Sequence, residues 1–312
     1  MLRRSLLFLS EQEGLKRALL RTRAARRMAD RFVAGEGLDE ALAAVRRLNQ
    51  DGFRATLDYL GESVSRASEA ERAADAYVES LARIAESEAE STISLKLTQL
   101  GLDIDPDLCA SHLERIVAAA QDAESFVRID MEGSAYTQAT LDQFGRIFPR
   151  YRNVGVVIQS YLLRSARDVE ELVEARAPVR LCKGAYKEPP EIAYQRRADI
   201  DAAYIHLARR LLDGARDGIP IAGVPPVALA THDHRLIDAG RSYADAHAVP
   251  SDAFEFQMLY GVRRDVQTQL VASGYHVRVY VPYGTEWYAY FMRRMAERPA
   301  NLWFVVRAAA GR

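Results

Sequence analysis

The feature that most constrains the fold is an alternation of eight short β-branched runs with longer helical patterns. Short apolar runs indicate buried strands, whereas apolar residues spaced three and four apart indicate amphipathic helices. Eight strands joined by helical crossovers predict an α/β fold in which a parallel sheet closes as a (β/α)8 TIM barrel. The expected strands are 54–58, 92–98, 126–131, 153–159, 179–183, 226–232, 253–258 and 276–281, and the helical patterns include 67–89, 108–120, 137–148 and 197–215.

The length of 312 residues fits one such barrel with an additional N-terminal part. A prior of about 150 residues per domain suggests two domains, but single α/β barrels also reach this size. Residues 15–33 and 38–48 look helical, and Gly35 and Gly37 separate them. We therefore expect an N-terminal helical arm over 1–50 and a barrel domain over 51–312. The arm either clads the barrel, covers its site or meets another subunit.

The expected strands carry polar side chains on one face. In the third strand, Val127 and Ile129 share the face opposite Arg128 and Asp130. A barrel strand buries its apolar face under the helices and points the other face into the barrel. TIM-barrel sites lie at the carboxyl ends of the strands, so polar groups converging there indicate an enzyme. The expected inward residues nearest those ends are Asp58, Lys96, Asp130, Gln159, Arg180, His232, Gln257 and Tyr280.

The charge balance and the cysteines restrict the partners and the compartment. Lys and Arg number 42 against 43 Asp and Glu, and a near-neutral chain disfavours nucleic acid, which usually needs a basic excess. The N-terminal apolar run ends at Leu9, which disfavours a secretory signal, and no stretch approaches the roughly 20 apolar residues of a membrane span. Cys109 and Cys182 form neither a disulfide framework nor a zinc signature. We expect a cytoplasmic protein.

Motifs for phosphate and metal binding are weak in this sequence. It contains no G-x-x-x-x-G-K-[ST] motif and no dinucleotide fingerprint. The run THDH at 231–234 could contribute to a zinc site, but a catalytic zinc needs about three protein ligands and no other strand end offers a histidine. We therefore expect no metal, and a hydrogen bond from His232 to a ligand. Lys96 and Lys183 are candidates for a Schiff base or for fixed cations, and the convergence of other cations favours the fixed cations.

The segment 280–294 suggests a binding site for a small carboxylate. A strand ends near Tyr280, and the helical pattern that follows carries Tyr290, Arg293 and Arg294. Adjacent arginines lie about 100° apart around a helix, so a solvated surface pair is the default interpretation. A helix after the last strand can instead lie over the barrel mouth, where both arginines could grip a carboxylate. Tyr280 and Tyr290 would then form walls for a partly apolar substrate.

These residues and motifs resemble those of the proline dehydrogenases, flavoenzymes that also form one domain of the bifunctional proline-utilisation proteins. The resemblance is to the compact, single-function bacterial type and spans about residues 50–305. The matching stretches are SLKLT at 94–98, RIDME at 128–132, VIQSY at 157–161, VRLCKGAY at 179–186, ATHD at 230–233, FEFQMLYG at 254–261 and the segment 280–294.

The resemblance implies an activity and its partners. It implies a distorted barrel with non-covalent FAD at the C-terminal mouth, where L-proline is oxidised to Δ1-pyrroline-5-carboxylate. A hydride would pass from proline C5 to flavin N5, and a membrane quinone would reoxidise the flavin. The protein would then be peripheral to the inner face of the plasma membrane and contact it transiently. The resemblance leaves the oligomeric state open.

The resemblance also implies roles for particular residues. The positions of the carboxylate clamp are Lys96, Arg293 and Arg294, beside the wall formed by Tyr290. The positions that shape the proline site or contact flavin N5 are Asp130, Tyr280 and Arg180. The FAD-contacting positions are Met131, Gln159, Lys183, Gly184, Ala185, Thr231 and His232. Glu62 would pair with an active-site arginine as a gate, and Cys182 stands where a small aliphatic residue is expected.

Two other functions stay open on the residues alone. A Schiff-base lyase could use Lys96 or Lys183 on the same barrel. A non-catalytic barrel could bind a small acid or another protein. Eight converging polar groups would be costly to desolvate without a ligand, which weighs against the non-catalytic barrel.

Overall fold

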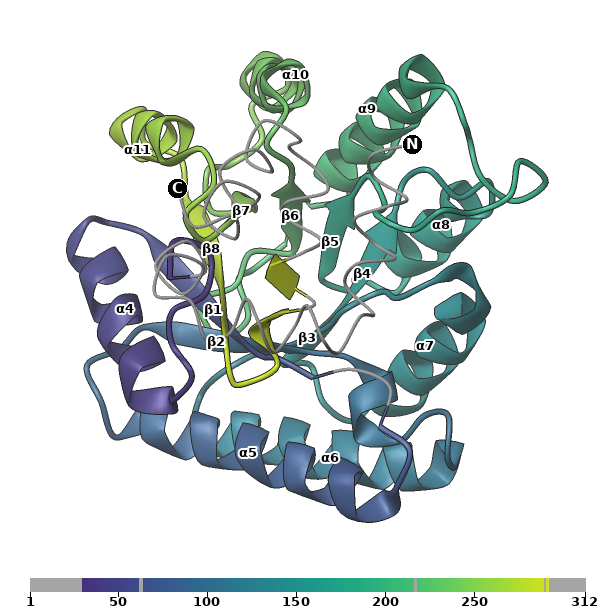
Figure 1. Cartoon of the computed structure of the whole chain (residues 1–312). Coiled ribbons are helices and arrows are strands. Elements are labelled where there is room, and N and C mark those ends of the chain that lie inside the picture. The colour runs from purple at the N-terminus through teal and green to yellow at the C-terminus, as the bar shows by residue number, and fades with distance from the viewer. Residues whose placement is uncertain (1–29, 62–63, 216–217, 289, 292–312) are drawn as a thin grey trace, which may run out of the picture.

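Eight parallel strands close into a barrel in a computed structural model that describes residues 30–61, 64–215, 218–288 and 290–291. The strands pair in sequence order, and β8 pairs with β1 to complete the barrel (Figure 1). The predicted TIM-barrel fold is therefore confirmed. The strands are β1 Arg54–Tyr59, β2 Ser91–Leu95, β3 Val127–Ile129, β4 Val154–Gln159, β5 Val179–Cys182, β6 Val227–Ala230, β7 Phe254–Leu259 and β8 Val277–Tyr283.

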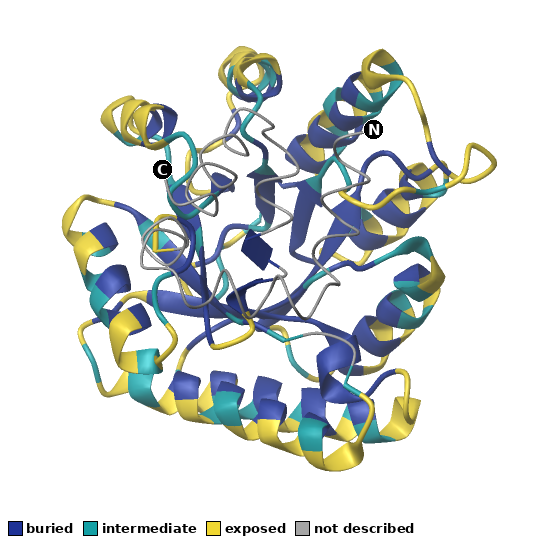
Figure 2. Cartoon of the chain, viewed as in Figure 1, coloured by how far each residue is buried: buried dark blue, intermediate teal, exposed yellow. Residues whose placement is uncertain are grey.

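Helices surround the barrel as an outer ring (Figure 1). Their barrel-facing sides are buried and their outer sides are exposed, as the amphipathic patterns require (Figure 2). The helices are α4 Leu38–Gln50, α5 Ala67–Ala85, α6 Pro106–Asp122, α7 Ser134–Ile147, α8 Ser165–Glu174, α9 Arg197–Gly214, α10 His234–Ala246 and α11 Arg264–Ala272. The first of these, α4, packs against β1 and β8 and buries Ala41, Leu42 and Val45 there.

Some expected elements end earlier than their sequence patterns suggest. The second expected strand, 92–98, stops at Leu95, and a short 3-10 helix, η1 (Leu97–Leu100), follows at once. This turn buries Leu97 and Leu100 completely and ends at Gly101, which adopts the left-handed conformation. The helical pattern 67–89 likewise ends at Ala85. The strand prediction was therefore wrong for 96–98, because burial of two leucines favours the turn over a longer strand.

Charged side chains fill part of the barrel interior below the carboxyl ends of the strands. Glu255 on β7 accepts a hydrogen bond from Arg278 Nε on β8 at 2.7 Å, and Arg278 Nη1 donates to the Ala55 carbonyl at 2.9 Å. Arg128 on β3 donates to the Pro178 carbonyl at 2.7 Å. Gly155 stands opposite Arg128 in the sheet register, and a Cβ there would collide with the Arg128 guanidinium. The glycine thus leaves the space that this buried cation occupies.

Candidate active site

Five polar side chains from five strand ends meet at the carboxyl end of the barrel, and we call them the mouth cluster. They are Asp58 on β1, Lys96 after β2, Asp130 after β3, Arg180 on β5 and Tyr280 on β8. Lys96 Nζ lies 3.1 Å and 3.3 Å from the two carboxylate oxygens of Asp58. Arg180 Nη1 donates to Asp130 Oδ1 at 2.7 Å, and the Tyr280 hydroxyl donates to Asp130 Oδ2 at 2.7 Å. Two cations, two carboxylates and a phenol therefore form two adjoining groups, Lys96 with Asp58, and Arg180 and Tyr280 with Asp130.

Strand register explains why these side chains meet. Asp58 stands opposite Ser94 in the pairing of β1 with β2, and alternation points both into the barrel. Ser94 accepts a hydrogen bond from Arg180 Nη2 at 2.9 Å, so one serine links two sides of the cluster. The Arg180 guanidinium also lies 5.4 Å from the centre of the Tyr280 ring. The sheet thus holds the cluster from the layer below.

Burial perturbs the titration of the mouth cluster. Asp58 is 1% exposed, and burial, with the nearby Asp130 carboxylate, raises its pKa to about 6 against the lowering effect of Lys96. Burial and the two carboxylates raise the pKa of Tyr280 well above its usual value. The phenol therefore remains a neutral hydrogen-bond donor at physiological pH. Strongly perturbed groups at a strand-end mouth are typical of active sites.

A buried glutamate, Glu132, ties the loops around the cluster together. Its carboxylate accepts from the Thr98 backbone N–H at 3.2 Å and from the Thr98 hydroxyl at 2.7 Å. Its carbonyl accepts from Gln159 Nε2 at 2.7 Å. These contacts join the segment after β3, which carries Asp130, to η1 and β4. Sequence reasoning quoted Glu132 within a motif but gave it no role, and its position two residues after Asp130 was the available signal.

A second charged group surrounds Lys183 at the end of β5. Lys183 Nζ lies 2.5 Å from Asp201 Oδ1 and 3.1 Å from Asp233 Oδ2. Partial burial would raise the pKa of Asp233, but hydrogen bonds from Lys183, Arg235 and Arg197 hold it well below its usual value. Lys183 is therefore placed as a fixed cation beside two carboxylates. Sequence reasoning missed Asp201 and Asp233, which lie on α9 and at the start of α10.

The remaining expected cofactor positions lie around these two groups. Gly184 has a φ of +118° and packs against the Tyr161 ring, where a Cβ would collide. The Thr231 hydroxyl accepts from the Asp233 backbone N–H at 3.2 Å. Met131 is buried and Ala185 is exposed.

Three expected inward residues lie outside the mouth cluster, and the first, Gln159, donates its amide to the Glu132 carbonyl. His232 Nε2 accepts from the Leu259 backbone N–H at 3.0 Å, which ties the end of β6 to β7. Gln257 Nε2 donates to Glu255 at 2.6 Å, so its amide belongs to the layer below. Within the part of the chain that the structure describes, no group of three or more His, Cys, Asp or Glu side chains could hold a metal ion.

The positions expected to form the carboxylate clamp fall partly within the described residues. Lys96 and Tyr290 are both buried, at 9% and 6% exposure. Glu62, Arg293 and Arg294 lie outside the described residues.

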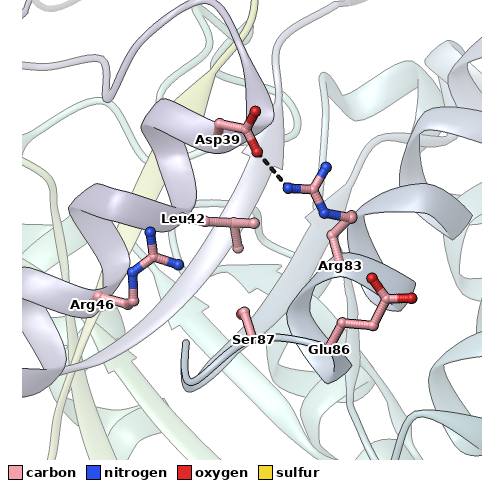
Figure 3. A pocket seen from close by; sticks show the side chains of 6 residues that line it. All are labelled: Asp39, Leu42, Arg46, Arg83, Glu86 and Ser87. Carbon is pink, nitrogen blue, oxygen red and sulfur yellow. Dashed lines mark hydrogen bonds and ion pairs between the residues drawn. The ribbon is translucent and has the colours of Figure 1, made fainter.

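A surface pocket lies apart from the strand ends, between α4 and α5 (Figure 3). Asp39 on α4 pairs there with Arg83 on α5. No residue of the mouth cluster lines it, so the pocket adds nothing to the candidate site. Its lining consists of Asp39, Leu42, Arg46, Arg83, Glu86 and Ser87.

Buried donors and acceptors without protein partners mark where a ligand could bind. Arg180 Nε and the Ser160 hydroxyl are buried and have no hydrogen-bond partner among the described residues. A buried polar group left unsatisfied costs about 1–3 kcal/mol. We therefore expect a ligand or water to satisfy them. The cations beside them suit a ligand with anionic or electron-accepting groups.

Comparison with known proteins gives a consistent family assignment. A family model described as "Proline dehydrogenase" matches residues 41–307. Proline dehydrogenase 2 of Bacillus subtilis (strain 168) is 39% identical over 302 residues, covering 96% of both chains. Proline dehydrogenase of Deinococcus radiodurans is 40% identical over 285 residues, covering 90% of this chain and 89% of that protein. A crystal structure of proline utilization A from Bdellovibrio bacteriovorus superposes with a TM-score of 0.80 at 29% identity, covering 89% of this chain but 33% of that longer one.

Proposed function

The chain belongs to the proline dehydrogenase family, and from this premise we propose the course of its reaction. It binds FAD non-covalently at the barrel mouth and oxidises L-proline to Δ1-pyrroline-5-carboxylate. The electrons pass to a quinone in the membrane, whose inner face the protein contacts transiently. The observation that carries this proposal is the mouth cluster, in which Arg180 is held by Asp130 and Ser94 while its buried Nε has no partner among the described residues.

The substrate is held by its carboxylate. Lys96, Arg293 and Arg294 bind this group, because an arginine remains charged at any physiological pH and offers paired donors. Tyr280 and Tyr290 bound the pyrrolidine ring. The amine must be unprotonated to lose a hydride from C5, so the work of the clamp is to orient the ring.

The residues at the mouth fit a flavin. When bound, FAD supplies the acceptor for the hydride of proline C5, at its N5 atom. Arg180 provides a donor for the charge that develops there. The residues that would hold the cofactor elsewhere are Met131, Gln159, Lys183, Gly184, Ala185, Thr231 and His232. Among them, Lys183 carries a positive charge suited to the cofactor's phosphates, and Gly184 keeps the backbone close to Tyr161.

A quinone acceptor in the membrane requires the protein to reach the membrane surface. Among the described residues, no helix is long and apolar enough to cross a bilayer. A quinone can be reached from the membrane surface, so we propose a peripheral and reversible contact.

The visible spectrum of the purified protein tests this function. We expect a yellow protein whose flavin absorbance bleaches when L-proline is added without oxygen and returns when a soluble quinone is added. A protein that takes up no FAD would contradict the proposal. Trapping of a carbonyl substrate by borohydride would favour a Schiff-base lyase instead.

The clamp gives a separate prediction. Arg293→Ala and Arg294→Ala are each expected to weaken proline binding by about ten- to a hundredfold while FAD remains bound, since each charge-assisted contact contributes roughly 1.5–3 kcal/mol. Steady-state KM and the bound flavin per protein provide the measurement. Arg146→Ala, which removes an exposed arginine paired with Asp107 on the outer surface, is the control. Unchanged kinetics in both clamp variants would remove the assignment.

A further inference from the structure

Asp58 contacts the Lys96 ammonium directly, although neither the motifs nor the family resemblance gave it a role. Both of its carboxylate oxygens accept from Lys96 Nζ, at 3.1 Å and 3.3 Å. We propose that Asp58 is a positioning residue of the proline site, which holds the Lys96 ammonium where the substrate carboxylate binds. This inference rests on the proposed function, in which Lys96 belongs to the carboxylate clamp.

Asp58 also connects the clamp to the residues beside the flavin. Asp58 lies close enough to Asp130 and Tyr280 for these groups to act on its titration, and the Tyr280 hydroxyl donates to Asp130 at 2.7 Å. Asp130 in turn accepts from Arg180 at 2.7 Å. The Lys96–Asp58 pair therefore lies beside the group formed by Tyr280, Asp130 and Arg180, and the two act on each other electrostatically. The clamp position and the reacting end of the site are thus neighbours.

The backbone around the pair is fixed independently. Gln99 on η1 donates to the Tyr59 carbonyl at 3.2 Å and accepts from the Tyr77 hydroxyl at 2.9 Å. These bonds tie the residues that follow Lys96 to the residue that follows Asp58. The strands of the pair are also in direct register, because Asp58 stands opposite Ser94. The position of the carboxylate relative to the lysine is therefore set before any substrate arrives.

The energetic cost of Asp58 argues for function over stability. A carboxylate that is 1% exposed and close to a second carboxylate is expensive to ionise, and its pKa is raised to about 6. A buried ion pair is often no more stable than a pair of well-packed apolar side chains. A long, flexible lysine that must meet a ligand at one point does, however, gain from a fixed counter-charge. Costly charges kept at a strand-end mouth are the pattern expected of a functional site.

The pair makes a prediction about pH. As the pH falls through about 6, Asp58 takes up a proton. The neutral carboxyl group then no longer attracts the Lys96 ammonium as the carboxylate did. The substrate carboxylate remains ionised in this range. KM for proline in the wild type, corrected for the fraction of proline whose amine is unprotonated, should therefore rise as the pH falls through about 6. The charged and titratable groups that act on Asp58 from the surrounding elements are Lys96, Asp130, Tyr77, Tyr280 and Tyr283. Arg180 pairs with Asp130 beside them.

The experiment compares Asp58→Asn with the wild-type flavoprotein. We expect KM for proline to rise roughly tenfold at pH 8, with kcat changed less than threefold and FAD content unchanged, because part of one charge-assisted contact is lost. In the variant, the KM corrected for the unprotonated fraction of proline should show no rise below about pH 6. Calorimetric binding of cyclopentanecarboxylate, which has the ring and carboxylate of proline but no oxidisable amine, should weaken in parallel.

The matched control is Asp168→Asn on α8. Asp168 is also a buried carboxylate, paired with Arg164 at 2.7 Å, but it lies outside the mouth. Its replacement should lower stability and leave KM and the pH profile unchanged.

The outcomes separate this inference from the proposed function. A wild type that does not reduce its flavin with proline would defeat the function itself. If the wild type is active but the KM of Asp58→Asn stays within twofold of the wild-type KM at every pH, only the role of Asp58 is overturned. If the variant does not fold, the wild-type profile decides, since a KM that is constant between pH 5 and 7 after correction for the unprotonated fraction of proline would equally overturn the role of Asp58.

Discussion

Replacing Arg180 by alanine is expected to slow the reduction of bound flavin by proline about 100- to 1000-fold in a single turnover. Arg180 is 6% exposed, and two of its nitrogens are fixed by Asp130 and Ser94. Its Nε, which has no partner among the described residues, is available as a preorganised donor. Loss of one such donor at a site of developing charge costs about this factor in rate. Anaerobic stopped-flow spectroscopy at saturating proline measures the effect directly.

The control for Arg180 removes another arginine that holds a buried carboxylate. Arg164 binds both oxygens of Asp168 at 2.7 Å and 3.0 Å, but on α8 rather than in the mouth. Arg164→Ala should lower stability and leave flavin reduction at the wild-type rate. If Arg180→Ala retains its flavin and reduces it within threefold of wild type, Arg180 has no part in the chemical step.

The strands and their order could be predicted because a closed parallel barrel imposes a strong local pattern. Each strand needs an apolar face under the helices, as Val127 and Ile129 show, and this requirement is visible in a single segment. Element ends were harder to predict, because they depend on distant packing. The chain turns after Leu95 because the turn buries Leu97 and Leu100 completely. The strand-like pattern of residues 96–98 does not reveal this burial.

The candidate site could be predicted where a single strand determines it. Alternation alone places Asp58, Asp130, Arg180 and Tyr280 inside the barrel near its carboxyl end. It does not say which of them touch. The contact of Asp58 with Lys96 depends on the register of β1 with β2, which only the folded sheet defines.

The residues around Lys183 were missed for a similar reason. Asp201 and Asp233 reach it from α9 and from the start of α10, across a crossover whose path the sequence does not specify. His232 and Gln257 were assigned to the mouth by alternation, but each finds a nearer partner, the Leu259 N–H and Glu255. A buried polar group forms a hydrogen bond with a partner within reach, and which partner is within reach depends on the folded structure.

Replacing Glu255 by alanine is expected to lower the free energy of unfolding by about 3–5 kcal/mol, the cost of leaving a buried charge without its partner. Glu255 is fully buried and accepts from Arg278 at 2.7 Å and from Gln257 at 2.6 Å, and Arg54 lies 3.7 Å away. The alanine variant leaves the Arg278 guanidinium, which is 4% exposed, without its carboxylate partner. Chemical denaturation at one fixed FAD concentration gives the difference, because bound ligand would otherwise contribute.

The pH dependence of this loss has a definite sign. Burial would raise the pKa of Glu255, but the charge and hydrogen bond of Arg278, together with Gln257 and Arg54, hold it below its usual value. A group whose pKa is depressed in the folded state adds stability above its unfolded pKa, and that stability is lost as the pH falls through the folded pKa. The difference between wild type and Glu255→Ala should therefore be full at pH 7 and shrink in acid.

An exposed ion pair provides the comparison that isolates burial. Arg167 and Glu171 on α8 lie 3.6 Å apart with both side chains more than two-thirds exposed, so Glu171→Ala should cost less than about 1 kcal/mol. A double variant, Glu255→Leu with Arg278→Met, should recover part of the loss, because no buried charge is then left alone. Recovery should be incomplete, since Arg278 also donates to the Ala55 and Gly223 carbonyls. A loss for Glu255→Ala as small as that for Glu171→Ala would mean that water reaches the barrel interior and screens the pair.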